Sequence, residues 1–159
     1  MEAILFQLGT QTFGIELDDL DEILMMCSLH KIPEAPNFIA GAINLRGSII
    51  PVIDLSQRLG FERPSPPPQV LENDLQQSDY QNNTRMLIVT VNQLRVGMII
   101  DGLQKVVTLS SDDHHEPVVN KAALPEYVDG VFVQGTGMIQ MIHIKQAISS
   151  EELSVLRNT

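Results

Sequence analysis

The residues of this chain that are most able to do chemistry stand in one short run, His114, His115 and Glu116. Imidazole and carboxylate groups are metal ligands, so this run is a candidate metal site. Adjacent residues of one loop rarely supply three or four well-placed donors, however, and no Cys or further His lies at ligand spacing from them. We therefore expect no metal site and no cofactor.

A nucleophile with a neighbouring base is a second catalytic pattern, for which Cys27 and His30 are the candidates. Such a pair is defined in space rather than in sequence, and a Cys among apolar residues is more often simply packed. The run Gly135-Thr136-Gly137 lacks the third glycine and the following helix of a dinucleotide-binding motif, so we interpret it as a hairpin turn. The sequence predicts no catalytic residue and no enzyme activity.

The charge and composition of the chain exclude further classes of function. Twenty acidic residues against ten basic ones give a formal net charge of −10, which repels phosphate backbones and anionic lipid. With five Phe, two Tyr and no Trp, the chain offers little surface for stacking on bases or sugars. We expect a protein that binds no nucleic acid and does not insert directly into a membrane.

The expected location follows from the absence of membrane and export signals in the sequence. No apolar run approaches the ~20 residues that span a bilayer, and the N-terminus lacks the basic start of a signal peptide. The single Cys27 cannot form an intramolecular disulfide, which suits a reducing compartment. We therefore expect a cytoplasmic protein.

Alternating apolar residues predict the elements that must position any site. Apolar side chains alternate with polar or small ones through residues 12–17, which is typical of a strand with one solvent-exposed face. Residues 3–8 form a strand before it, and the two make a hairpin. Residues 43–45 and 49–53 flank Arg46-Gly47-Ser48, which predicts a second hairpin.

This strand pattern occurs twice in the chain. A shift of 83 residues places 3–8 on the apolar run 86–91, and a shift of 89 places 50–53 on 139–142. Two windows with nearly the same shift indicate a duplicated β unit. Each copy has about five strands, which is too few for a sandwich and suggests a small barrel.

We therefore predict an all-β fold in which residues 1–159 form a single domain of two packed β-barrel subdomains, roughly 1–60 and 85–148. Between them, residues 61–84 combine four prolines with a polar acidic run, which predicts an exposed loop. Short helices are expected at 36–40 and 55–59. A C-terminal helix is expected at about 150–157, where Ser149 and Glu152 have capping-box spacing.

Differences between the two copies are the best sequence-level signal for function. Two barrels that are built alike need the same core residues, so differences at matching surface positions are free to serve binding. Arg46 at a hairpin tip is matched by Gly135, and Glu22 is matched by Lys105, a reversed charge. Arginine is a frequent binding hot spot because its planar fork pairs with carboxylates or carbonyl groups.

Three motifs follow one another in the first half of the chain: Pro36-Asn37-Phe38-Ile39-Ala40-Gly41, then Asn44-Leu45-Arg46-Gly47, then Pro51-Val52-Ile53-Asp54-Leu55. This specific stretch resembles the CheW family of chemotaxis coupling proteins. The stretches 6–23 and 96–103 also resemble the family. The resemblance covers nearly the whole chain except the Pro-rich loop, which is longer than usual.

The resemblance implies two SH3-like five-stranded β-barrels packed around a shared apolar seam. It also implies a non-enzymatic scaffold that couples methyl-accepting chemoreceptors to the CheA histidine kinase. The expected partners are the regulatory domain of that kinase and the cytoplasmic tip of a chemoreceptor.

By position, the resemblance implies partner-binding roles for Leu20, Glu22, Ile23, Arg46, Leu103 and Val106. The first three match the family's segment at the groove between the barrels, and Leu103 and Val106 match the second-barrel segment that lines the same groove. Arg46 matches the arginine of the receptor-facing hairpin.

Three alternatives stay open at the level of sequence. The first is a CheW-like adaptor of another chemosensory pathway, such as type IV pilus twitching motility. The second, of another class, is a small-ligand or metal-binding protein that uses His114, His115 and Glu116. The third is a coupling domain of a longer protein, against which Met1 and the short predicted tail argue.

Overall fold

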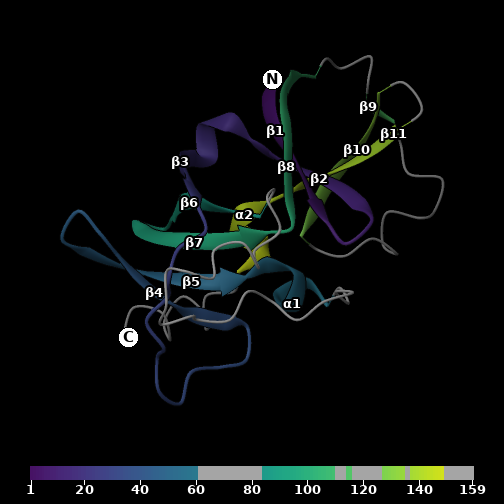
Figure 1. Cartoon of the computed structure of the whole chain (residues 1–159). Helices are drawn as coiled ribbons and strands as arrows, with labels where there is room; N and C mark the ends of the chain where they lie inside the picture. Colours follow the sequence, from purple (N-terminus) through teal and green to yellow (C-terminus); the bar gives the residue numbers. More distant parts are fainter. Residues whose placement is uncertain (61–83, 110–113, 116–126, 135–136, 149–159) are drawn as a thin grey trace.

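The computed structural model describes residues 1–60, 84–109, 114–115, 127–134 and 137–148, which form two β-sheets and three short helices (Figure 1). One sheet has six strands in the order β8-β1-β2-β11-β10-β9. Its members are β1 (Glu2–Leu8), β2 (Gln11–Glu16), β8 (Gly102–Thr108), β9 (His114–His115), β10 (Val128–Gln134) and β11 (Gly137–Ile142). The last strand, β9, is only two residues long.

The other sheet has five strands in the order β3-β6-β7-β5-β4. Its members are β3 (Leu20–Met25), β4 (Ile39–Leu45), β5 (Ser48–Asp54), β6 (Arg85–Val91) and β7 (Leu94–Ile100). The helices are η1 (Leu17–Asp19), α1 (Leu55–Leu59) and α2 (Ile144–Ala147). The all-β prediction is confirmed, with the difference that neither ladder closes into a complete barrel over the described residues.

The sheet topology confirms the sequence repeat. The shift of 83 relates β1, β2 and β3 to β6, β7 and β8, and the shift of 89 relates β4 and β5 to β10 and β11. Under these shifts the order β3-β6-β7-β5-β4 becomes β8-β1-β2-β11-β10. The parallel pairs β5–β7 and β11–β2 correspond too. Gly97 lies opposite Val52 in the first pair, and their equivalents Gly14 and Met141 lie opposite each other in the second. The two sheets are therefore structural equivalents.

The predicted boundaries of the subdomains, roughly 1–60 and 85–148, are wrong for the sheets. The six-stranded sheet combines strands from 2–16 with strands from 102–142, and the five-stranded sheet combines 20–54 with 85–100. In each copy of the repeat, the first hairpin thus belongs to one sheet and the later strands belong to the other. The crossings lie at η1 and at Asp101, the residue between β7 and β8.

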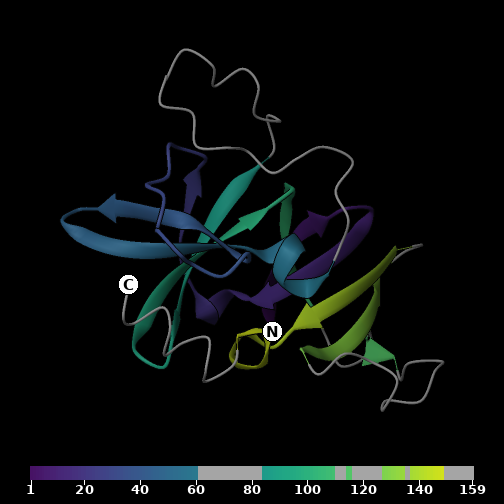
Figure 2. The same ribbon diagram turned by 90° about the horizontal axis from the view of Figure 1, so that it is seen from below.

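A shared apolar cluster joins the two sheets. It takes from the six-stranded sheet Ile4, Phe6, Leu8, Phe13 and Ile15, and from the five-stranded sheet Leu87, Val89, Val91, Val96 and Met98. Phe6 and Phe13 stack with their ring centroids 6.4 Å apart. Both α-helices contribute to this cluster, through Leu55 of α1 and Ile144 of α2. Figure 2 shows α1 near the centre of the view and α2 below it. This cluster is the shared apolar seam that the family resemblance implies.

The helices and loops differ from the prediction in a few places. The helix at 55–59 is confirmed as α1, whose first turn is capped by Asp54 accepting a hydrogen bond from the Gln57 N–H at 3.4 Å. The helix expected at 36–40 is wrong, because Ile39 already begins β4 and the preceding residues form a turn.

The exposed loop expected at 61–84 falls almost entirely outside the described residues. Its last residue, Thr84, lies directly before β6 and is buried, so the prediction of an exposed residue is wrong at that position. The helix expected at about 150–157 also lies outside the described residues. Among the helices that are described, none is long and apolar enough to cross a membrane.

Candidate functional site

The predicted partner-binding residues lie on two equivalent edge strands and one hairpin. Glu22 and Ile23 follow Leu20 on β3, which is the edge of the five-stranded sheet. Leu103 and Val106 lie on β8, which is the edge of the six-stranded sheet. The β4–β5 hairpin, which projects from the five-stranded sheet in Figure 1, presents the remaining candidate, Arg46, at its turn.

The apolar candidates divide into a half-buried pair and an exposed pair. Leu20 and Leu103 are half-buried and pack against the shared cluster. Ile23 is 38% exposed and Val106 is 52% exposed. Their cross-strand neighbours, Leu87 and Ile4, belong to the shared cluster, so Ile23 and Val106 stand on the same side of their sheets as the seam. No described contact joins these two exposed side chains directly.

A tight turn positions Arg46. Leu45 pairs with Ser48, so only Arg46 and Gly47 form the turn, with φ angles of 51° and 88°. Positive φ at both central residues is the pattern of a type I′ hairpin turn, which usually takes Asn or Gly at the first position. The Asn44 side chain accepts a hydrogen bond from the Gly47 N–H at 3.0 Å. The turn therefore aims an arginine outward from a backbone conformation that arginine rarely adopts.

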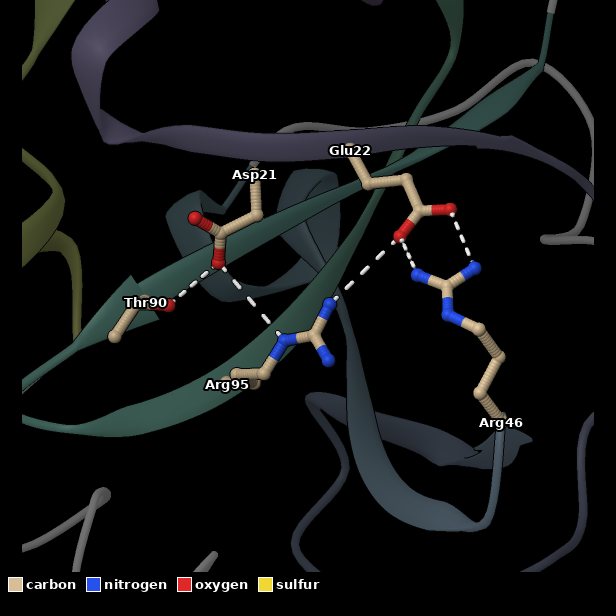
Figure 3. Close-up of polar contacts among 5 residues, drawn as sticks. All are labelled: Asp21, Glu22, Arg46, Thr90 and Arg95. Carbon is tan, nitrogen blue, oxygen red and sulfur yellow. Dashed lines mark hydrogen bonds and ion pairs between the residues drawn. The ribbon is translucent and has the colours of Figure 1, made fainter.

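Arg46 and Glu22 form a two-pronged ion pair between the hairpin and the edge strand (Figure 3). The Arg46 Nη1 donates to Glu22 Oε1 at 3.1 Å, and Nη2 donates to Oε2 at 2.5 Å. The Arg46 side chain remains 66% exposed while that of Glu22 is 25% exposed. Paired donors fix the guanidinium plane, so Glu22 holds Arg46 in one orientation and leaves much of its surface exposed to solvent.

Three residues that the sequence analysis did not select extend this pair into a charged network. Arg95 of β7 lies 3.9 Å from the Asp21 carboxylate and 3.7 Å from Glu22 Oε2. Thr90 of β6 donates a hydrogen bond to Asp21 at 2.5 Å. Figure 3 shows these side chains together, across β3, β6 and β7. We call Asp21, Glu22, Arg46, Thr90 and Arg95 the charged network.

The charged network changes the acid–base properties of its members. The hydrogen bond from Arg46 holds the pKa of the Glu22 carboxyl below its usual value. Partial burial opposes this shift, and the charges of Arg46 and then of Arg95 add to it. The same hydrogen bond raises the pKa of Arg46. Glu22 is therefore ionised, and the pair is intact, throughout the neutral range.

The equivalent place on the six-stranded sheet lacks this charge pattern. Gln104 and Lys105 of β8 stand where β3 has Asp21 and Glu22, and Thr12 stands where β7 has Arg95. There the Gln104 Nε2 donates to Thr12 Oγ1 at 3.4 Å. A comparison of the two sequence copies at a shift of 83 would have identified Arg95 and Asp21 as further differences.

The remaining chemical candidates are the run at 114–116 and Cys27. Among the residues that the structure describes, no group of three or more His, Cys, Asp or Glu side chains is placed to hold a metal ion. Glu116 of the candidate run lies outside the described residues. The structure leaves Cys27 exposed rather than packed as expected, and partial desolvation raises the pKa of its thiol, which disfavours the reactive thiolate.

A cleft of about 430 Å³ lies beside Thr90 and does not include any of the six predicted partner-binding residues. Its lining includes Glu16, Asp19, Phe132, His143 and Lys145. The Nδ1 atom of His143 is buried there without a hydrogen-bond partner among the described residues.

Comparison with known proteins gives a consistent result across nearly the whole chain. Residues 2–152 match the family model of the CheW-like domain. The chemotaxis protein CheW of Treponema pallidum is 32% identical over 158 residues, which cover 99% of this chain and 87% of the relative. The chemotaxis protein CheW of Klebsiella aerogenes is 30% identical over the same length and with the same coverage.

A solved structure with the same fold supports this result. The scaffolding protein TtCheW from Thermoanaerobacter tengcongensis superimposes with a TM-score of 0.77 at 27% identity. The match covers 95% of this chain and 94% of that protein. The resemblance noted from the sequence motifs is thereby confirmed.

Proposed function

Since the chain belongs to the CheW-like domain family, we propose that it is a scaffold of chemotaxis signalling that couples chemoreceptors to a CheA-type histidine kinase. The observation that carries this proposal is the extent of the family match, which runs from residue 2 to residue 152 and so includes both sheets and both edge strands. The scaffold acts by binding and has no catalytic step.

The docking surface of this proposal combines apolar and charged parts. Ile23 and Val106 offer apolar contacts at the two sheet edges, and Leu20 and Leu103 support them from the shared cluster. An amphipathic helix at the tip of a receptor is a suitable partner for such edges, because its apolar stripe replaces water on both. Interfaces of standard size bury about 800 Å² on each partner, so a second face remains for the kinase.

Arg46 provides the directional contact in this proposal. Its guanidinium is exposed, held by Glu22 and ready to donate further hydrogen bonds to a carboxylate or carbonyl group. Signalling follows if the receptor states bind the scaffold with different affinities, because only a difference in affinity shifts an equilibrium.

Arg46→Ala tests the proposal directly. We expect the variant to bind a soluble fragment of the chemoreceptor tip from the same organism roughly thirtyfold more weakly, the loss typical of a hot spot. Lys31→Ala is the matched control, since Lys31 is an exposed basic residue outside the charged network. Both variants should keep the wild-type circular dichroism spectrum. Equal binding by Arg46→Ala and wild type in a calorimetric titration would refute the role of Arg46.

Co-purification of the full chain from its source cells tests the partners as a set. We expect a CheA-type kinase and a chemoreceptor to be recovered together. Recovery of a kinase from a pilus-twitching pathway instead would place the chain in that alternative pathway with the same fold.

A further inference from the structure

A second arginine, Arg95, lies close to the Glu22 carboxylate of the Arg46–Glu22 pair. Arg95 lies on β7, two strands in from the edge strand β3, and its side chain extends outward across the sheet (Figure 3). Its Nη2 is 3.7 Å from Glu22 Oε2, the oxygen that also accepts the shorter bond from Arg46. Its Nε is 3.9 Å from Asp21. One guanidinium thus faces two neighbouring carboxylates.

The geometry of β3 explains why these two carboxylates need a cation. Leu20 pairs with Val89 and Glu22 pairs with Ile88, so Asp21 is the extra residue of a bulge. The bulge brings Asp21 and Glu22 to the same guanidinium instead of sending them to opposite faces. Two adjacent carboxylates repel each other, and a positive charge between them offsets that repulsion.

The fold itself does not require these charges. The equivalent bulge in β8 has Gln104 as its extra residue, and the Gln104 Nε2 donates a neutral hydrogen bond to Thr12 Oγ1. The backbone pairing around both bulges is the same. The charges of the five-stranded sheet are therefore additional to what this local structure needs, which indicates a role beyond folding.

We propose that Arg95 is a positioning residue of the docking surface, which holds Asp21 and Glu22 in place so that Glu22 can hold Arg46. Arg95 is 38% exposed, and its distances to the carboxylates are those of ion pairs rather than short hydrogen bonds. The contribution of Arg95 to folding stability is therefore small. A positioning role is distinguished from a merely structural one by the effect of Arg95 on the orientation of Arg46. The inference rests on the proposed function only in the test that measures binding of a receptor fragment.

The first test measures the mobility of Arg46 without any partner. In ¹⁵N relaxation experiments on the full chain, we expect the Arg46 Nε–H to be ordered in wild type and more mobile in Arg95→Gln. Arg95→Lys should restore part of the order because it keeps the charge. Glu22→Gln is the positive control and Lys31→Gln the negative control. If Glu22→Gln mobilises Arg46 and Arg95→Gln does not, the proposal is wrong.

The second test is a double-mutant cycle with the receptor-tip fragment. We expect Arg95→Gln to weaken binding roughly two- to fivefold, the scale of an exposed ion pair, in the wild-type background. In the Arg46→Ala background the same substitution should have no further effect, because Arg95 acts through Arg46. Independent, multiplying losses would mean that Arg95 contacts the partner itself, which contradicts a positioning role. If wild type does not bind the fragment, the proposed function fails while the relaxation experiment still decides the role of Arg95.

Discussion

The edge strands β3 and β8 occupy the same place in two equivalent sheets, and they differ almost only where they face solvent. Leu20 and Leu103 pack against the same shared cluster, and Ile23 and Val106 are both exposed beside it. Facing away from that cluster, β3 holds an ionised glutamate under Arg46, while Lys105 stands in the corresponding place on β8.

This difference separates what the fold requires from what is additional to it. Features that both strands share, the apolar side chains and the bulge, are those that build a sheet edge on the shared cluster. Features found at one of the two edges only, the charged network above all, are not needed for a sheet edge to form. In a duplicated fold, each copy is an internal control for the other.

The largest expected effect tests whether the two sheets depend on one cluster. Phe13 and its counterpart Val96 are both fully buried there. We expect Phe13→Ala to lower the free energy of unfolding by about 3–5 kcal/mol and Val96→Ala to lower it by less, since a smaller side chain is removed. Gln7→Ala, at an exposed position on β1, should change it by no more than about 0.5 kcal/mol.

Urea unfolding monitored by circular dichroism gives these energies, and methyl NMR signals from each sheet report whether the transitions coincide. We expect one transition for both sheets in every variant. Separate transitions for the two sheets would show that the shared cluster does not couple them.

An intermediate effect tests whether the two edges are equivalent in binding. Ile23→Asp and Val106→Asp each place a charge on an exposed apolar position. We expect each to weaken binding of the receptor-tip fragment roughly tenfold, because an unpaired carboxylate is desolvated at the interface. Gln7→Asp adds the same charge elsewhere and should have little effect. If only Ile23→Asp weakens binding in a calorimetric titration, β8 is not part of the docking surface.

The smallest expected effect tests whether the Arg46–Glu22 ion pair lowers the pKa of Glu22 on β3. Because the pKa of Glu22 is lowered in the folded chain, its ionised form contributes stability above the unfolded value of 4.5 and loses it as pH falls through the lower folded value. We therefore expect the Arg46–Glu22 pair to persist below pH 4.5, as followed by the ¹³C shift of the Glu22 carboxyl. In Arg46→Ala the titration should move upward. A titration midpoint that is the same in both proteins would contradict the ion pair.

Much of the fold was predictable because its signals are local. Alternating residues predicted the first two strands, and Gly47 next to Arg46 predicted the hairpin turn. The duplication was predictable because both copies need the same apolar pattern. The helix expected at 36–40 was wrong because pairing of β4 with β5, which begins at Ile39, outweighed local preference.

The candidate site was only partly predictable. The difference between the copies and the family motifs pointed to Glu22 and Arg46, but each was assigned separately. Their ion pair, and the approach of Arg95 to Asp21, depend on the order of strands in the sheet. Arg95 and Thr90 stand directly opposite each other on β7 and β6, far along the chain from β3.

By itself, the sequence determined which segments are strands, that they occur twice and that the surface is acidic, since each of these follows from side-chain type and spacing. Only the tertiary structure decided which copy of each strand pairs with which. β3 pairs with β6 rather than with β1, although β1 and β6 have the same pattern. The sequence pattern alone allows either of two equivalent strands as a partner. The pairing that is observed is the one in which both sheets are buried against one cluster.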